Sequence, residues 1–197
     1  QLVRRGIPAA DAEQPLARSE PTVSLIPLRP SSLAGHRPLP GHLSALIAPE
    51  LLNLLARPLK RGLRAFRLDA LADAESPAKG PGLSDNGNFV LSEFKVTARP
   101  LDPKSKAKPV TVKVKGTAAT FEQKNYPLAA VTDNKRGSGW AVAPEFGKDH
   151  AAVFEIEGEP VGFEGGTELE FQLVFRGFFG LGKLRLGFSN AGQTPAL

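Results

Sequence analysis

The sequence predicts an all-β protein, an antiparallel β-sandwich of jelly-roll type with an extended N-terminal arm. After Gly62, successive runs alternate apolar and polar residues or are rich in branched and aromatic residues, as strands are. Turn residues separate these runs, and 20 glycines and 18 prolines among 197 residues supply many turns. No strand–helix–strand alternation appears, so a parallel nucleotide-binding sheet is not expected.

The first part of the chain has a less regular pattern. Residues 1–21 show no apolar period and predict an extended arm or linker. From Thr22 to Pro40, the prolines leave room for short strand pieces only. The leucine-rich residues 43–57 leave two structures open. One is a helix that Pro49 would break or begin, and the other is a pair of buried strands on either side of Pro49.

The alternating pattern predicts which side chains face the core. Residues 64–71 place Phe66 and Leu68 on one face, opposite Arg67 and Asp69. Further strands are expected within 88–96, 110–116, 151–157, 167–175 and 183–188. The other residues predicted to face inward are Val110, Val112, Val114, Phe154, Ile156, Leu169, Phe171, Leu173, Phe175, Leu184, Leu186 and Phe188. The β-sandwich domain is predicted to span residues 22–190, followed by a C-terminal tail at 191–197.

The glycine-rich residues 79–88, "KGPGLSDNGN", raise the possibility of a phosphate-binding loop. They have neither GxxxxGK[ST] nor GxGxxG spacing, and a predicted strand follows them where a helix would be needed. Asp85, Asn86 and Gly87 are typical turn residues. The segment is therefore expected to shape the chain.

Residues 126–142, "YPLAAVTDNKRGSGWAV", form the candidate binding loop and contain the only Tyr and the only Trp. Asp133, Asn134 and Arg136 could hydrogen-bond sugar hydroxyls, and the oxygens of Asp133 and Asn134 could ligate calcium. Trp140 could stack on a pyranose ring. The alternative is that Trp140 plugs one end of the sandwich while Asp133 and Asn134 form a turn.

Composition argues against several classes of function. The absence of Cys excludes disulfides and thiol chemistry. The three His residues are far apart in sequence and no GxSxG motif occurs, so no catalytic residue, metal site or cofactor is predicted. No run of 18 apolar residues occurs, so no membrane span is predicted. The net charge is +5, but basic residues are scattered among acidic ones and residues 104–108, "KSKAK", suggest a solvated hairpin tip, so a nucleic-acid partner is not expected.

Two blocks of sequence carry a resemblance. Residues 63–96 combine an RLxAL-type strand, a PxxGPG turn and the run "NGNFVLSEF", and residues 126–175 contain "TDNKRGSGWA", "GKDHAAVFE" and "GGTELEFQL". With the opening "IPLRPSS" (Ile26–Ser32), they resemble an uncharacterised domain of large exported planctomycete-type proteins. That domain often accompanies cytochrome-c-like domains. The resemblance covers roughly residues 23–190.

The resemblance implies a jelly roll similar to galactose-binding, discoidin-like modules, and it favours strands within residues 43–57. Three positions depart from the family pattern. Leu25 stands where Trp is usual, Leu83 where Arg is usual, and Asn134 where Gly is usual. The cytochrome domains have no counterpart in this sequence, so no redox role is implied.

We therefore expect a non-catalytic, extracytoplasmic binding module for a glycan or cell-surface polysaccharide. The alternative is a structural subunit of a cell-surface assembly, filament or larger complex. Such a subunit would contact other proteins or its own copies through the arm, the sandwich faces and the apolar Gly177–Gly182 segment. The chain contains no Met, so residue 1 is expected to follow a processing or truncation point.

Overall fold

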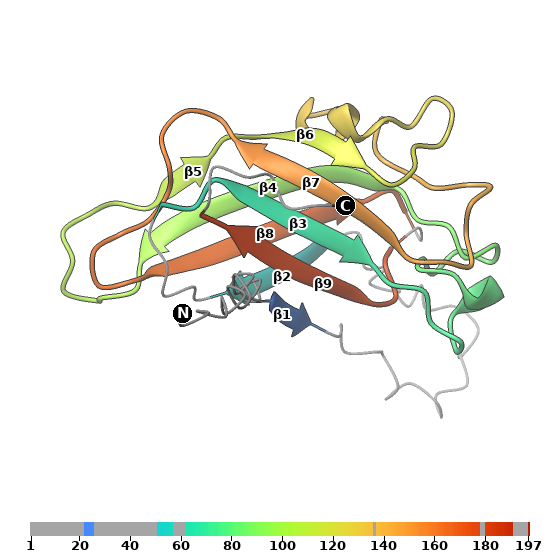
Figure 1. Cartoon of the computed structure of the whole chain (residues 1–197), viewed down its shortest axis with the longest axis horizontal. Coiled ribbons are helices and arrows are strands. Elements are labelled where there is room, and N and C mark those ends of the chain that lie inside the picture. Colours follow the sequence, from blue (N-terminus) through green and yellow to red (C-terminus); the bar gives the residue numbers. More distant parts are fainter. Residues whose placement is uncertain (1–21, 26–50, 57–61, 136, 178–179, 191–196) are drawn as a thin grey trace, which may run out of the picture.

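The computed structural model describes residues 22–25, 51–56, 62–135, 137–177, 180–190 and 197. Within these residues the protein is all-β, and its strands form two antiparallel sheets that face each other (Figure 1). The described helical segments are two short 3-10 turns, η2 (Pro77–Lys79) and η3 (Leu128–Thr132). No helix in this part of the chain is long and apolar enough to cross a membrane. The predicted all-β class with antiparallel sheets is confirmed.

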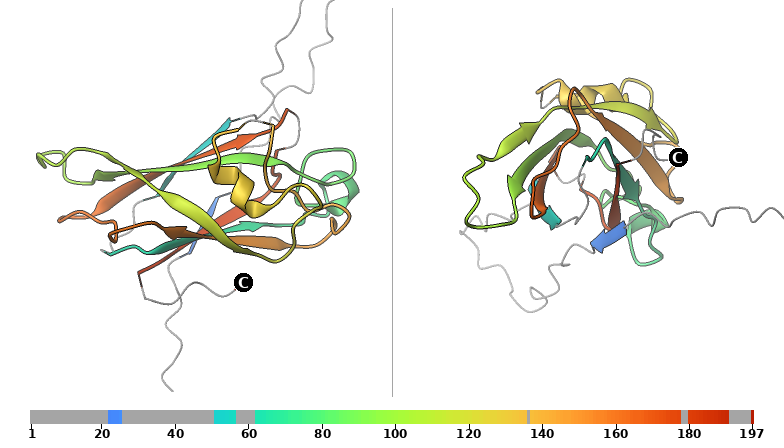
Figure 2. Two further views of the ribbon diagram at one scale, coloured as in Figure 1. Left: turned by 90° about the horizontal axis from the view of Figure 1, so that it is seen from above. Right: turned by 60° about the vertical axis from the view of Figure 1, so that its left-hand side comes forward.

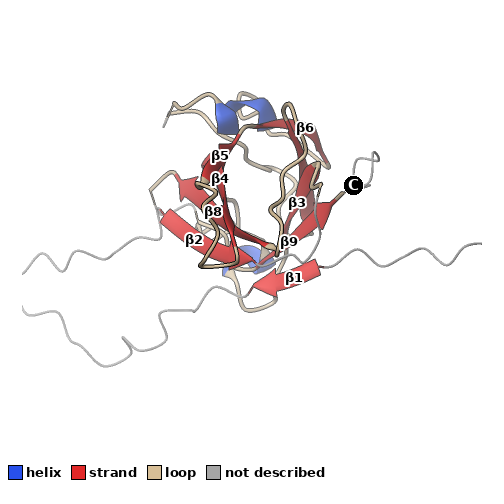
Figure 3. Ribbon diagram, turned by 90° about the vertical axis from the view of Figure 1, so that its left-hand side faces the viewer, coloured by secondary structure: helices blue, strands red, loops and turns tan. Residues whose placement is uncertain are grey.

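One sheet has five strands and the other has four. In spatial order, the first contains β1 (Thr22–Leu25), β9 (Leu184–Ser189), β3 (Ala65–Ala70), β7 (His150–Ile156) and β6 (Val114–Ala119). The second contains β2 (Leu51–Ala56), β8 (Thr167–Phe175), β4 (Leu91–Pro100) and β5 (Val110–Val112). Figure 3 looks along the molecule and shows the two sheets on opposite sides of the core.

The chain passes directly from one sheet to the other between β5 and β6. Val112 is buried beside Val96 of the four-stranded sheet, and Val114 is buried beside Ile156 of the five-stranded sheet. Only Lys113 separates the two strands. One nearly continuous strand therefore forms an edge of both sheets and closes that side of the sandwich.

The predicted inward-facing pattern holds for most strands. In β8 every odd residue from Thr167 to Phe175 is buried and every even one is half-buried. Val110 is an exception, because its side chain is 49% exposed. It lies at the start of β5, where the hairpin after β4 extends past the core, so the prediction that Val110 faces inward is wrong.

The structure describes residues 51–56 of the leucine-rich segment. Leu51–Ala56 is strand β2, paired antiparallel with β8, so strand formation is confirmed for these residues. Cross-strand pairing outweighs the helical propensity of leucine here. Residues 43–50, the predicted arm at 1–21 and residues 191–196 of the predicted tail lie outside the described residues.

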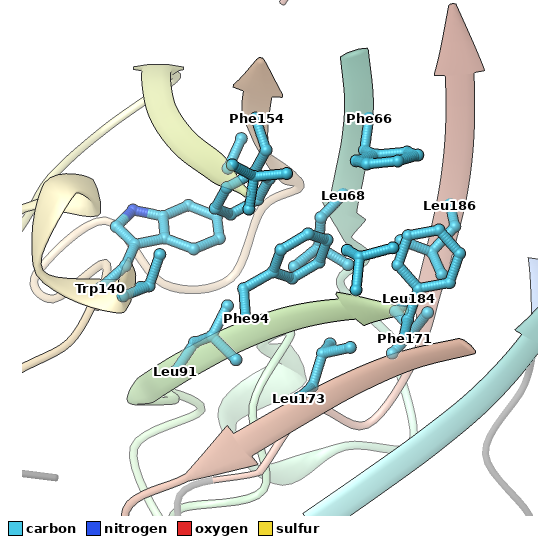
Figure 4. Close-up of a cluster of buried hydrophobic side chains, with 14 of the residues drawn as sticks. Phe66, Leu68, Leu91, Phe94, Trp140, Phe154, Phe171, Leu173, Leu184 and Leu186 are labelled. Carbon is cyan, nitrogen blue, oxygen red and sulfur yellow. The ribbon is translucent and has the colours of Figure 1, made fainter. Parts of the chain in front are cut away.

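Aromatic side chains join the two sheets across the core (Figure 4). Phe94 of β4 stacks on Phe154 of β7 with ring centroids 4.0 Å apart, and Phe66 of β3 meets Phe171 of β8 edge-on at 5.2 Å. All four rings are at most 2% exposed. Burying each such side chain contributes about 1.5–3 kcal/mol. The phenylalanine-rich composition thus fills the space between the sheets.

Three long connections meet at one end of the sandwich, on the right in Figure 1. They join β3 to β4, β6 to β7, and β8 to β9, and span residues 71–90, 120–149 and 176–183. The first two hold the glycine-rich segment and the candidate binding loop. The antiparallel topology therefore brings both sequence motifs to the same end.

Candidate functional site

The glycine-rich loop is a compact turn in which two stretches of backbone touch. The amide of Gly82 donates to the carbonyl of Gly87 over 2.9 Å, and the Ser84 hydroxyl donates to the Asn88 carbonyl over 2.6 Å. A side chain at Gly82 would place its Cβ 1.8 Å from the Asn88 carbonyl oxygen. The glycines are therefore needed for close packing within the loop, which agrees with the shaping role expected from the sequence.

Asn88 connects this loop to the β6–β7 connection. Its side chain is 6% exposed, donates to Oε1 of Gln123 over 3.0 Å, and accepts from the Val142 amide over 3.1 Å. Oε1 of Gln123 also accepts from the Ala143 amide over 3.1 Å. Each side-chain bond of Asn88 thus spans distant parts of the sequence. Asn88 is not indicated by the sequence, because its turn-like neighbours explain an asparagine there without a buried partner.

Trp140 is a core residue. Its side chain is 0% exposed, and its ring meets Phe89 at a centroid distance of 4.9 Å. The indole N–H donates to the Phe121 carbonyl over 2.9 Å, so its one polar atom is satisfied. A buried ring offers no face to a sugar, and the predicted stacking role of Trp140 is therefore wrong for this structure. The alternative, that Trp140 plugs one end of the sandwich, agrees with its position.

The backbone around Trp140 explains why Gly139 precedes it. Trp140 and Leu91 exchange both backbone hydrogen bonds, over 2.8 and 2.9 Å. A Cβ on Gly139 would lie 2.4 Å from the Leu91 carbonyl oxygen. The Gly-Trp pair thus fastens the end of the candidate loop to the start of β4.

The candidate loop itself is a turn held by Asp133. This carboxylate accepts from the Lys135 amide over 2.7 Å and from the Ser138 hydroxyl over 2.9 and 3.0 Å. Asn134 adopts a φ of +60°, which Asn and Gly tolerate better than other residues. Asp133, Asn134 and Lys135 are all exposed. Arg136 lies outside the described residues, so the structure brings together only Asp133 and Asn134 of the predicted site at the surface.

The same end holds a buried histidine that the sequence did not indicate as functional. His150 is 2% exposed at the start of β7, and its Nε2 lies 2.5 Å from the Glu145 carbonyl oxygen. A carbonyl can only accept, so Nε2 carries the proton and the neutral Nδ1 accepts from the Thr120 hydroxyl at 3.2 Å. Burial lowers the pKa of His150, an effect that the hydrogen bond to Glu145 partly opposes.

These hydrogen bonds suit a structural role for His150. The Thr120 hydroxyl also accepts from the Ala151 amide over 3.0 Å, so this pair belongs to the junction where β7 begins. The side chain of Glu145 faces solvent, where Lys148 hydrogen-bonds it and lowers the pKa of its carboxyl group. Among the described residues, no group of three or more His, Cys, Asp or Glu side chains could hold a metal ion.

Comparisons with known proteins add no relative. No protein family model matches this chain, and no curated protein or solved structure matches it. What the site can do therefore follows from its own groups. At the described surface of the candidate loop these are hydrogen-bond donors and acceptors on a fixed turn, which suit a polar ligand.

Proposed function

We propose that this protein is a non-catalytic, extracytoplasmic binding module that recognises a carbohydrate with the loop end of its sandwich. One observation carries the proposal: Asp133, Asn134 and Lys135 are exposed on a turn that is hydrogen-bonded to Ser138 and followed by buried residues, at the end where three long connections meet. Recognition loops held by a sheet scaffold have this arrangement. The jelly-roll relationship to galactose-binding modules and the extracytoplasmic location belong to the proposal and rest on the sequence resemblance.

The base under the turn is well fixed. Trp140 comes two residues after Ser138 and is buried, and the amides of Val142 and Ala143 just beyond it donate to the side chains of Asn88 and Gln123. A fixed turn loses little conformational entropy on binding. The rigid base therefore favours direct recognition of a polar ligand without prior ordering of the loop.

The groups that would contact the sugar differ from those expected from the sequence. The Asn134 amide supplies donors and an acceptor, and Lys135 supplies a cationic donor. Asp133 is largely engaged in holding the turn, so its role is to position its neighbours. Trp140 serves as an anchor beneath them. Arg136 remains a proposed contact.

The decisive substitution is Asn134→Gly. Glycine keeps the positive φ that the turn requires and removes only the amide side chain. Loss of one or two hydrogen bonds is expected to weaken binding of a neutral glycan about three- to tenfold, without a change in Tm. The measurement is a glycan array followed by calorimetric titration of the best neutral ligand. If no neutral glycan from a broad panel binds the wild-type protein, the proposal fails.

The alternative of a structural subunit stays a prediction. It depends on contacts through residues 1–21, the sandwich faces and the Gly177–Gly182 segment, of which residues 1–21, Phe178 and Phe179 lie outside the described residues. Of the flanking apolar segment, Gly180 and Leu181 are buried, which removes Leu181 from the expected contact surface. A molar mass in solution equal to one chain at high concentration would count against self-assembly.

A further inference from the structure

One stretch of the chain, which forms an edge of the sandwich, carries most of the formal net charge. Residues 100–121 contain five lysines and one aspartate, so this segment carries +4 of the chain's net charge of +5. The lysines are Lys104, Lys106, Lys108, Lys113 and Lys115. Basic residues occur throughout the sequence, but elsewhere acidic residues nearly cancel them. We call this set the lysine edge.

The segment occupies a distinct place in the fold. Its first part is the hairpin between β4 and β5, which extends beyond the left-hand end of the sheets in Figure 1. Its second part is the strand that runs from β5 into β6 along the closed side of the sandwich, seen from above in the left view of Figure 2. The hairpin lysines therefore lie at the end opposite the candidate loop, whereas Lys113 and Lys115 lie along the side, on the strand that goes on to pack against η3.

All five lysines are exposed. Val112 and Val114 are buried, so Lys113 and Lys115 lie on the outer face of the strand. An extended chain advances about 3.3 Å per residue, so residues 104–115 span at most about 40 Å. Because the lysines follow one another along the chain from the hairpin into β6, they are spread along the edge of the sandwich.

Basic residues on the sheet faces are tied to acidic partners, whereas these lysines are not. Arg67 and Arg185 both donate to Asp69, over 2.7 and 2.8 Å. Arg99 pairs with Glu168 and Glu170. In the described part of the chain, no ion pair joins any lysine of the lysine edge to another residue. Glu155 is the cross-strand neighbour of Lys115, but the structure shows no ion pair between them, so the charge of these lysines is available to an outside partner.

Protection of the sheet edge accounts for only part of this arrangement. Lysines on an edge strand discourage pairing with another chain, and Lys113 and Lys115 are placed to do so. Lys104, Lys106 and Lys108 precede β5 in a segment that pairs with no strand. Their excess charge needs another explanation.

We propose that the lysine edge binds a linear acidic polysaccharide through its carboxylate or sulfate groups. Unpaired point charges spread along an edge match a polymer that repeats one anionic group along its length. Residues 100–121 contain no Arg, and their one aromatic residue, Phe121, is half-buried. Nucleic-acid sites rely on bidentate Arg contacts and on stacking with exposed aromatic rings, so the composition favours a polyanion without bases.

This inference takes its class of ligand from the proposed function but concerns a second surface. Two pairs of substitutions test it, Lys104→Gln with Lys108→Gln and Lys113→Gln with Lys115→Gln. Lys79→Gln with Lys124→Gln is the matched control, because it removes the same charge from exposed positions at the loop end. Since the substituted side chains are exposed and without ion pairs, all three variants should keep the wild-type Tm, which a circular dichroism melt checks.

The probes are labelled polygalacturonate and dextran sulfate, with neutral dextran as the uncharged counterpart, and binding is followed by fluorescence anisotropy. The wild-type protein should bind both acidic polymers in 50 mM NaCl and not dextran. Binding should weaken at least about tenfold in 200 mM NaCl, because counterions are released. Each edge variant should bind about tenfold more weakly than wild type, and the control variant within about twofold.

Several results would overturn the inference. The inference fails if both edge variants bind the acidic polymers as tightly as the wild type does. It also fails if the control variant loses as much affinity as the edge variants, or if the wild type binds neutral dextran as tightly as the acidic polymers. Tighter binding of single-stranded DNA or of phosphatidylglycerol vesicles than of either polysaccharide would replace the proposed partner class. The proposals for the candidate loop and for the lysine edge can be tested independently. Asn134→Gly should leave dextran sulfate binding unchanged, and the edge variants should leave neutral-glycan binding unchanged.

Discussion

Gly82 lies where two stretches of the glycine-rich loop touch, and its lack of a side chain allows that contact. A Cβ there would lie 1.8 Å from a backbone oxygen, so the loop must shift to accept Gly82→Ala. We expect this substitution to lower the free energy of unfolding by about 3 kcal/mol. Gly137→Ala is the control, because nothing lies within 4 Å of a Cβ built there. Urea unfolding measures both, and equal stabilities would contradict the packing role of Gly82.

His150 predicts how the stability of the protein depends on pH. Burial keeps the folded-state pKa of this imidazole below that of the unfolded chain, which is about 6.5. Between those two pKa values the unfolded state binds more protons, so stability is full above about pH 7 and falls as the pH drops toward the folded pKa. Lys148 nearby also lowers the pKa, whereas Glu145 and Asp149 oppose the shift.

The test compares the wild type with His150→Gln at pH 7.5, 6.5 and 5.5 by urea unfolding. The variant is expected to be less stable at pH 7.5, because it fits the hydrogen bonds of His150 less well. The difference between the two proteins should narrow on acidification, by at most about 1.4 kcal/mol per pH unit. His36 and His42 are present in both proteins, so their effect cancels. A difference that stays constant with pH would contradict a neutral, buried His150.

At the scale of elements, the connections at the loop end are joined by side chains as well as by backbone. Asn88→Ala would leave the Val142 amide without its buried partner, and Gln123→Ala would do the same to the Ala143 amide. Each substitution should cost about 1–3 kcal/mol. Because the two side chains also bond each other, the double variant should lose less than the sum, with a coupling of about 1 kcal/mol.

The control for this double-mutant cycle is a second cycle that combines Asn88→Ala with Asp102→Ala. Asp102 holds a turn in the hairpin at the opposite end, where its carboxylate accepts from the Lys104 amide. Effects at such distant sites should add within about 0.5 kcal/mol. If the losses in free energy of unfolding for Asn88→Ala and Gln123→Ala were also additive, the β3–β4 and β6–β7 connections would be energetically independent.

At the scale of the whole molecule, local pattern predicted the sheets better than the site. A two-residue period needs only neighbours in sequence, so β8 and β9 were predicted with their buried faces. Val110 was predicted incorrectly because the pattern does not reveal where the core ends. Trp140 was assigned to a ligand because the sequence near it is polar, whereas its burial depends on Phe89 and Phe121, which are distant in sequence. Asn88 was missed for the same reason.

The strand shared by both sheets also guards against misfolding. A one-residue slip in an ordinary edge strand exchanges inner and outer side chains in one sheet only. A slip of the β5–β6 strand would turn Lys113 and Lys115 toward the interior and expel Val112 and Val114 from both sheets at once. Burying an unpaired charge has a large free-energy cost, so such a register is strongly disfavoured. Because the strand belongs to both sheets, a register shift in either half of the sandwich is strongly destabilising.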